Sequence, residues 1–70
     1  MSHTVRQWRL MKEISQQSVA DALGIHVNTY RKLEENPNRI TIEEAHKISA
    51  LFGVPMDKID FSLSKTLQNV

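Results

Sequence analysis

Two residues four positions apart, Ala20 and Gly24, constrain the fold of this chain more than any other feature. Val19 and Leu23 lie on one face of a short helix, because residues four apart share a helical face. Ala20 sits beside them, where its small side chain permits a second helix to pass closely. Gly24 then provides the left-handed conformation that ends a helix without strain. The pattern predicts two short helices joined by a tight turn.

The second helix of this pair has an apolar and a polar face. Tyr30 and Leu33 return apolar surface to the core of the first helix. The opposite face has no core to bury into, so we expect it to meet another molecule. The side chains on this face are Val27, Asn28, Arg31 and Lys32.

Across the whole chain the sequence predicts five helices and no convincing strand. Capping boxes begin the first helix after Thr4 and the fourth after Thr41. Trp8 and Ile42 are expected to face the core. The expected helices cover about residues 5–13, 16–24, 27–35 and 42–53, followed by a short one that Pro55 opens and that carries Ile59 and Phe61.

Length and composition limit the class of protein. Seventy residues form one small domain, whose core supplies about 3–5 kcal/mol of net stability. The chain has no cysteine for disulfides or thiolate metal sites, and no stretch long enough to span a membrane. The first twenty residues lack the apolar run of a signal peptide. The net charge is +1, with +2 over residues 1–39 and −1 over residues 40–70, and this balance alone does not indicate nucleic-acid binding.

Nothing in the sequence favours an enzyme. Glu43, Glu44 and His46 share one helical turn, but they lack the spacing and the second histidine of a zinc site. We therefore expect no catalytic residue, no metal and no cofactor.

From about Val5 to Phe61 the chain resembles the helix-turn-helix family of phage repressors and Cro proteins. The matching residues are Arg9, Ile14-Ser15-Gln16, Ala20, Gly24-Ile25, Leu33-Glu34 and the run from Ile48 to Val54. The resemblance implies an all-α, compact five-helix bundle of the lambda-repressor type over residues 1–61. It also implies a sequence-specific transcriptional regulator that binds double-stranded DNA in the cytoplasm of a bacterial or phage-infected cell.

The polar face over residues 27–35 carries the expected base contacts. Asn28 both donates and accepts, which matches the N6 and N7 edge of adenine. Lys32 can reach guanine O6 and N7 or a phosphate, and Val27 can pack against a thymine methyl. The resemblance points to the same three residues, because the family usually touches bases from these positions.

Phosphate contacts are expected at the start of the second helix and around the third, because exposed backbone N–H groups attract anions at helix N-termini. In the family, a glutamine at the position of Gln16 touches both a phosphate and the base-reading side chain. The other candidates are Gln17, His26, Thr29, Arg31, Asn36, Asn38 and Arg39. The resemblance further implies a structural ion pair between Arg9 and Glu34, which links the first and third helices.

Four residues depart from the family pattern. Glu13 replaces a common glycine, and it either lengthens the first helix by a turn or strains the corner. His26 replaces a Ser or Thr cap and caps less well; it either gains a proton beside a phosphate below about pH 6.5 or stays an exposed neutral histidine. Asn36 tolerates a left-handed backbone where relatives have glycine. Ile40 replaces a proline, which leaves the path of the loop open.

The tail over residues 62–70 is a possible dimerisation segment. Leu63, Leu67 and Val70 lie at helical spacing, and they either pack against a second chain or cover the core of their own. Two-fold dimers of this fold class set their recognition helices about 34 Å apart, which predicts a homodimer on a palindromic operator. The alternative function is a protein-interaction module that binds and antagonises another repressor.

Overall fold

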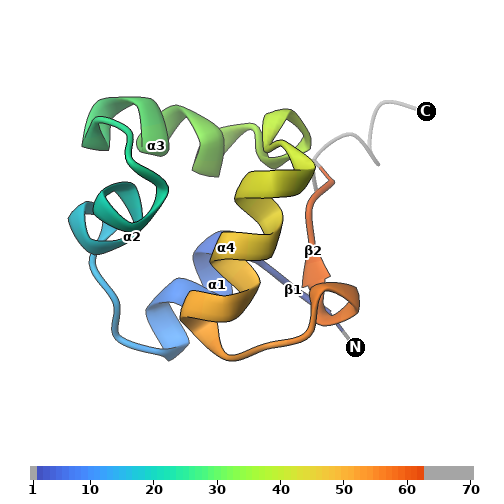
Figure 1. Cartoon of the computed structure of the whole chain (residues 1–70). Helices are drawn as coiled ribbons and strands as arrows, with labels where there is room; N and C mark the ends of the chain where they lie inside the picture. The colour runs from blue at the N-terminus through green and yellow to red at the C-terminus, as the bar shows by residue number, and fades with distance from the viewer. Residues whose placement is uncertain (1, 63–70) are drawn as a thin grey trace.

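Four α-helices, two 3₁₀ helices and a pair of short strands make up residues 2–62, the part of the chain that the computed structural model describes (Figure 1). In chain order they are β1 (His3–Thr4), α1 (Val5–Met11), α2 (Gln16–Leu23), α3 (Val27–Glu35), η1 (Pro37–Arg39), α4 (Ile42–Phe52), η2 (Met56–Lys58) and β2 (Ile59–Asp60). The all-α class and the two helices joined by a tight turn are confirmed.

The predicted helix starts are confirmed by their caps. Thr4 and Thr41 each accept a hydrogen bond from the backbone three residues ahead, and the Gln or Glu there accepts one from the cap. Ser15 caps α2 through the backbone N–H of Ser18. Gly24 ends α2 at φ +72°, in the left-handed region that the sequence predicted.

The core lies where α2, α3 and α4 meet. Tyr30 and Ile48 are its largest fully buried side chains, and Ala20 is also fully buried. Trp8 is only half-buried at the edge of this core, where its Nε1 donates to the Lys58 carbonyl at 2.8 Å. The expected core position of Ile42 is wrong: its side chain is 71% exposed. Ile42 is the first residue of α4, and the apolar face of that helix reaches the core only further along the chain.

The predicted last helix is correct only in part: Pro55 opens the short 3₁₀ helix η2 (Met56–Lys58), but this helix ends before Ile59 and Phe61. After η2, the chain forms β2, which pairs in parallel with β1 in the register His3 with Ile59 and Thr4 with Asp60. Ile59 is buried in the core as expected, but it reaches the core from a strand. The segment after Pro55 is too short for a stable helix, and the first residues of the chain offer it an extended partner. The Trp8 bond to Lys58 holds the same junction.

The corner between α1 and α2 is strained at Glu13. Helix α1 ends at Met11, so Glu13 does not lengthen it. Glu13 adopts φ +57°, and it is the one non-glycine residue with positive φ in the described part of the chain. This conformation costs an L-residue roughly 1–2 kcal/mol.

Replacing Glu13 with glycine is therefore expected to stabilise the protein by about 0.5–1 kcal/mol. Glycine removes the steric cost of the left-handed backbone, but it loses more conformational entropy on folding. Urea denaturation of wild type and E13G measures the change. Glu13→Ala is the control, because it keeps the Cβ atom and with it the strain. An E13G midpoint at or below that of the wild type would contradict the expectation.

The loop after α3 follows a path that the sequence left open. Asn36 has φ −131°, so it does not use the left-handed conformation. Its Nδ2 donates to the Lys32 carbonyl at 3.3 Å, and Pro37 then begins η1 with its ring buried. Ile40 packs against the core at the end of this turn. The tail positions Leu63, Leu67 and Val70 lie outside the described residues.

Among residues 2–62, no helix has both the length and the apolar character needed to cross a bilayer.

Candidate nucleic-acid interface

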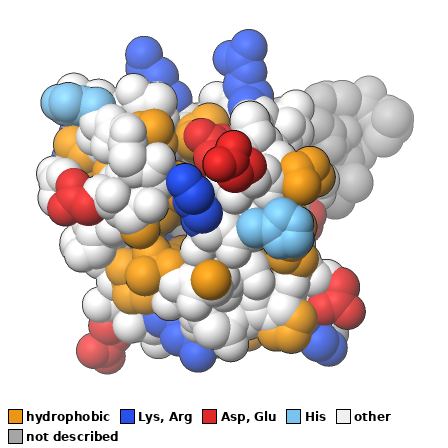
Figure 2. All heavy atoms as spheres, in the orientation of Figure 1, with side chains coloured by type: hydrophobic (Ala, Val, Ile, Leu, Met, Phe, Trp, Pro, Cys, Tyr) orange, Lys and Arg blue, Asp and Glu red, His pale blue; other side chains and the backbone are white. Residues whose placement is uncertain are grey.

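Helix α3 lies along one edge of the molecule, above α1 and α4 in the view of Figure 1. Tyr30 is its buried residue, and four polar side chains on its other face are exposed. Lys and Arg side chains project beyond the surface over α3 (Figure 2). The four polar residues are Asn28, Thr29, Arg31 and Lys32, and Glu35 at the end of α3 is exposed as well. Val27 differs from the expectation of a free face, because it is half-buried and packs against the core.

Arg9 and Glu34 join α1 to the end of α3. The Arg9 Nε donates to one carboxylate oxygen of Glu34, and its Nη2 lies 3.4 Å from the other. Its Nη1 donates to the Ile14 carbonyl at 2.9 Å, at the start of the corner before α2. Both side chains are buried, with 9% and 3% of their surfaces exposed. A buried pair of this kind holds the helices in place mainly because breaking it leaves an unpaired charge.

Glu34 accepts two further hydrogen bonds. The Tyr30 hydroxyl donates to it at 2.6 Å, and Gln16 Nε2 donates at 3.1 Å. Burial alone raises the pKa of Glu34, but the hydrogen bonds from Arg9, Tyr30 and Gln16 and the charge of Arg9 outweigh burial and hold this pKa below its usual value. Burial, together with the neighbouring carboxylate, raises the pKa of Tyr30. Glu34 therefore stays ionised and Tyr30 stays protonated near neutral pH.

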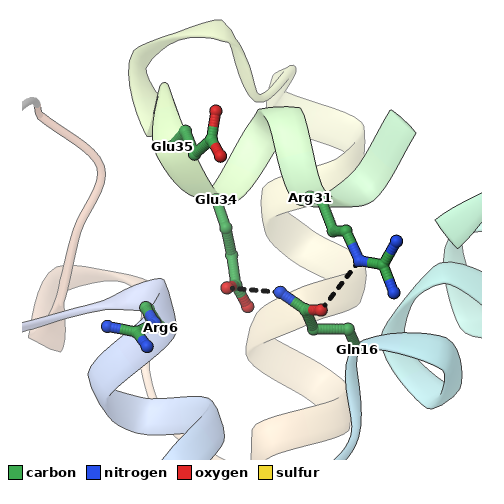
Figure 3. A pocket seen from close by; sticks show the side chains of 5 residues that line it. All are labelled: Arg6, Gln16, Arg31, Glu34 and Glu35. Carbon is green, nitrogen blue, oxygen red and sulfur yellow. Dashed lines mark hydrogen bonds between the residues drawn. The ribbon is translucent and has the colours of Figure 1, made fainter. Parts of the chain in front are cut away.

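Gln16 connects this ion pair to the exposed face of α3. Its side chain lies between Glu34 and Arg31, as the dashed lines in Figure 3 show. Arg31 Nε donates to Gln16 Oε1 at 3.1 Å, and Arg31 Nη1 donates to Asn28 Oδ1 at 2.8 Å. A continuous set of hydrogen bonds thus runs from Arg9 in α1 to Asn28 at the start of α3.

The stability of the protein is expected to fall in acid because of Glu34. Its pKa in the folded state is below the ordinary value of 4.5, so the unfolded chain binds the proton more readily. The stabilisation is complete above about pH 4.5 and is lost as the pH falls through the folded-state pKa. Urea denaturation between pH 7 and pH 3 measures this loss. Arg9→Met combined with Glu34→Gln removes both charges and is expected to flatten the curve below pH 4.5, and an equally steep curve would contradict the assignment.

His26 caps α3 through its ring. Nδ1 accepts a hydrogen bond from the backbone N–H of Asn28 at 3.0 Å, the bond that a Ser or Thr cap would accept. Since Nδ1 accepts, the proton of the neutral imidazole is on Nε2. The His26 ring is thus exposed, and it fulfils the capping role with Nδ1 as the acceptor.

Replacing His26 with alanine is expected to destabilise the protein by about 1 kcal/mol, because it removes the cap of α3. His26→Ser restores a side-chain acceptor and is expected to recover this loss. Thermal unfolding of the three proteins at neutral pH measures both effects. Equal stability of the wild type and the alanine variant would show that the ring contributes no cap.

The other phosphate candidates are more scattered. Gln17 Nε2 donates to Asp21 Oδ1 at 2.9 Å, so the Gln17 side chain lies along α2. Asn38 and Arg39 are exposed on η1, directly after α3. The structure thus brings Gln16, Arg31 and Asn28 into one set of contacts, but it does not bring Gln17 into that set.

Sequence reasoning missed the polar role of Tyr30, which it assigned to the core alone. Tyr30 and Glu34 are four residues apart on one helix, a spacing at which side chains meet, so the bond was open to prediction. It also missed that Gln16 donates to Glu34. Among residues 2–62, no group of three or more His, Cys, Asp or Glu side chains is placed to hold a metal ion.

The match of a family model decides the family. The model described as "Helix-turn-helix" matches residues 5–59, which include α1 to α4 and end in β2. The chain belongs to this helix-turn-helix family. The helix-turn-helix chain is also 28% identical over 58 residues to the cryptic phage CTXphi transcriptional repressor RstR of Vibrio cholerae. The alignment covers 83% of this chain and 52% of RstR, so the chain spans about half the length of this curated relative. No solved structure matches the chain significantly.

Proposed function

We propose that this chain is a sequence-specific, double-stranded DNA-binding transcriptional regulator whose helix α3 enters the major groove. One observation carries the proposal: α3 exposes Asn28 and Lys32 on one side, while Tyr30 and the bonds of Glu34 anchor it on the other. A helix held rigidly with polar side chains outward can present them to base edges in a fixed register. The family, and the repressor named among its relatives, support the same conclusion.

Three residues are proposed to contact bases. Asn28 and Lys32 are exposed and one turn apart, so both can face the same stretch of the groove. Val27 lies at the first position of α3 and is only half-buried, which leaves part of its side chain for a thymine methyl.

The phosphate contacts are proposed to flank these residues. Gln16 begins α2, where backbone N–H groups attract anions, and His26 uses Nδ1 for its cap bond, which leaves Nε2 to donate to a phosphate oxygen. Arg39 and Asn38 follow α3 on η1. The full proposed set is Gln16, Gln17, His26, Thr29, Arg31, Asn36, Asn38 and Arg39.

We further propose that two copies bind a palindromic operator. One α3 helix offers few base contacts, and two-fold pairs of such domains read two half-sites about one DNA turn apart. A second copy therefore increases both the number of contacts and the specificity.

A salt titration of binding to random double-stranded DNA tests the proposal. Fluorescence anisotropy at about 50 to 200 mM monovalent salt is expected to show micromolar binding that weakens steeply as salt rises, because phosphate contacts release counterions. Absence of binding at 50 mM salt would contradict a DNA-binding function.

The second candidate function is a module that binds another repressor. It is favoured by the net charge of only +1 and by Leu10 and Met11, which are 52% and 56% exposed at the end of α1. Under this alternative, the chain would fail to bind random DNA in the same titration and would associate with a repressor protein instead.

A further inference from the structure

A series of hydrogen bonds links Arg9 to Asn28 through Glu34, Gln16 and Arg31. In each of these bonds, chemistry fixes which group donates. A guanidinium group only donates hydrogen bonds and a carboxylate only accepts them. Gln16 lies between the Glu34 carboxylate and Arg31, so its Nε2 must face Glu34 and its Oε1 must face Arg31. The orientation of the amide is therefore set by chemistry at both ends.

The same logic fixes the amide of Asn28. Arg31 Nη1 donates to it at 2.8 Å, so the atom that faces Arg31 is Oδ1. Arg31 is itself held through Nε by Gln16, and Gln16 is held by the buried Glu34. Asn28 therefore has its oxygen directed toward its own helix, and its amide nitrogen is the group left for another molecule.

This orientation changes which base Asn28 matches. The adenine edge needs one donor and one acceptor from the protein, whereas the guanine edge presents two acceptors, N7 and O6. An asparagine whose oxygen already accepts from Arg31 keeps one further lone pair on Oδ1, so an adenine N6 donor must share this oxygen with Arg31, whereas both amide N–H groups stay free for guanine. Sequence reasoning from the free side chain pointed to adenine, because it treated the oxygen as available.

We propose that Arg31 determines specificity: by holding the Oδ1 of Asn28, it favours donation from the Asn28 amide and thereby directs Asn28 to the N7 and O6 of guanine. The inference rests on the proposed DNA-binding function. Arg31 has five N–H groups, and the two bonds described use two of them. The others can contact a phosphate while the Asn28 bond persists. Exclusion of water at a DNA interface strengthens such a bond.

The test is selection from a randomised double-stranded DNA library with the wild type and four variants. Asn28→Ala identifies the base pair that Asn28 reads, because preference is lost there. At that position the wild type is expected to select guanine. Arg31→Ala is expected to change the ratio of guanine to adenine affinities by about tenfold in favour of adenine, because the freed Asn28 oxygen can then accept from N6.

Two matched variants separate positioning from charge. Arg31→Lys keeps the positive charge but lacks the guanidinium Nε that donates to Gln16. Base preference is therefore expected to move toward adenine, while the salt dependence of binding stays unchanged. Asn28→Asp keeps the shape and the bond to Arg31 but has no donor for the groove. It is expected to lose guanine and select cytosine, whose N4 amino group donates.

Two results would overturn the inference and leave DNA binding intact. The first is a wild-type selection of adenine at this position. The second is a uniform loss of affinity for all four base pairs in both Arg31 variants, which would make Arg31 a phosphate contact alone. If the wild type binds no DNA, the proposed DNA-binding function is refuted together with the base preference that rests on it. The contact is then tested in the free protein, where the NMR signals of the Asn28 side-chain amide are expected to shift in Arg31→Ala; unchanged signals would overturn the positioning.

Discussion

Replacing Glu34 with alanine is expected to unfold most of the protein at room temperature. The change leaves the Arg9 charge buried without its partner, and removing one member of a buried pair costs about 3–5 kcal/mol. Tyr30 and Gln16 lose an acceptor at the same time. A core of this size supplies only about 3–5 kcal/mol in total. The loss is therefore comparable to the whole stability of the chain.

Urea denaturation followed by circular dichroism measures this loss. Glu35→Ala is the matched control, because it removes the same charge from the neighbouring exposed position and is expected to cost little. Arg9→Met combined with Glu34→Gln removes both charges, and its cost is expected to be smaller than the sum of the single changes. If the alanine variants at 34 and 35 were equally stable, Glu34 would not be the centre of the structure's polar contacts.

The helix-turn-helix pair was predictable because local rules fixed it. Ser15 and Gly24 bound α2 by cap chemistry that acts within a few residues, and the structure places both caps as expected. The start of α3 follows in the same way from the turn after Gly24. Such signals need no knowledge of the rest of the fold.

The end of the chain was harder to predict because its structure depends on a distant partner. Ile59 has the periodicity of a short helix, but it pairs with His3, more than fifty residues earlier in the chain. Nothing local in either segment indicates a strand of two residues. Ile42 was misplaced for a related reason, because periodicity identifies a helix face but not how far the core extends along it.

The candidate site was predictable in its residue types but not in their orientation. Gln16, Asn28 and Arg31 were each identified as polar residues near the expected interface. The sequence does not reveal that Arg31 also bonds Gln16, because this bond depends on the angle at which α2 meets α3. The bond from Arg31 to Asn28 lies within α3 at helical spacing, so it was open to prediction. Orientation decides which atoms remain for a partner, so it alters the expected chemistry without altering the residues involved.

Replacing Asn28 and Lys32 together with alanine is expected to reduce affinity for a selected operator by about a hundredfold or more. Each good base contact contributes about 1–3 kcal/mol of discrimination, and both side chains are exposed on the same face of α3. The substitutions remove no core contact, and alanine favours a helix, so thermal stability is expected to be unchanged.

Competition binding against random DNA, with thermal unfolding alongside, measures both expectations. Lys58→Ala is the matched control for charge, because Lys58 is exposed in η2, on the side of the molecule away from α3 in Figure 1. It is expected to keep the preference for the operator. Because the double variant retains the backbone amides and Arg31, residual binding to random DNA should remain and should still weaken with salt. Loss of preference together with a lower melting temperature would instead indicate that the substitutions damaged the fold, and an undiminished preference would move the reading surface away from α3.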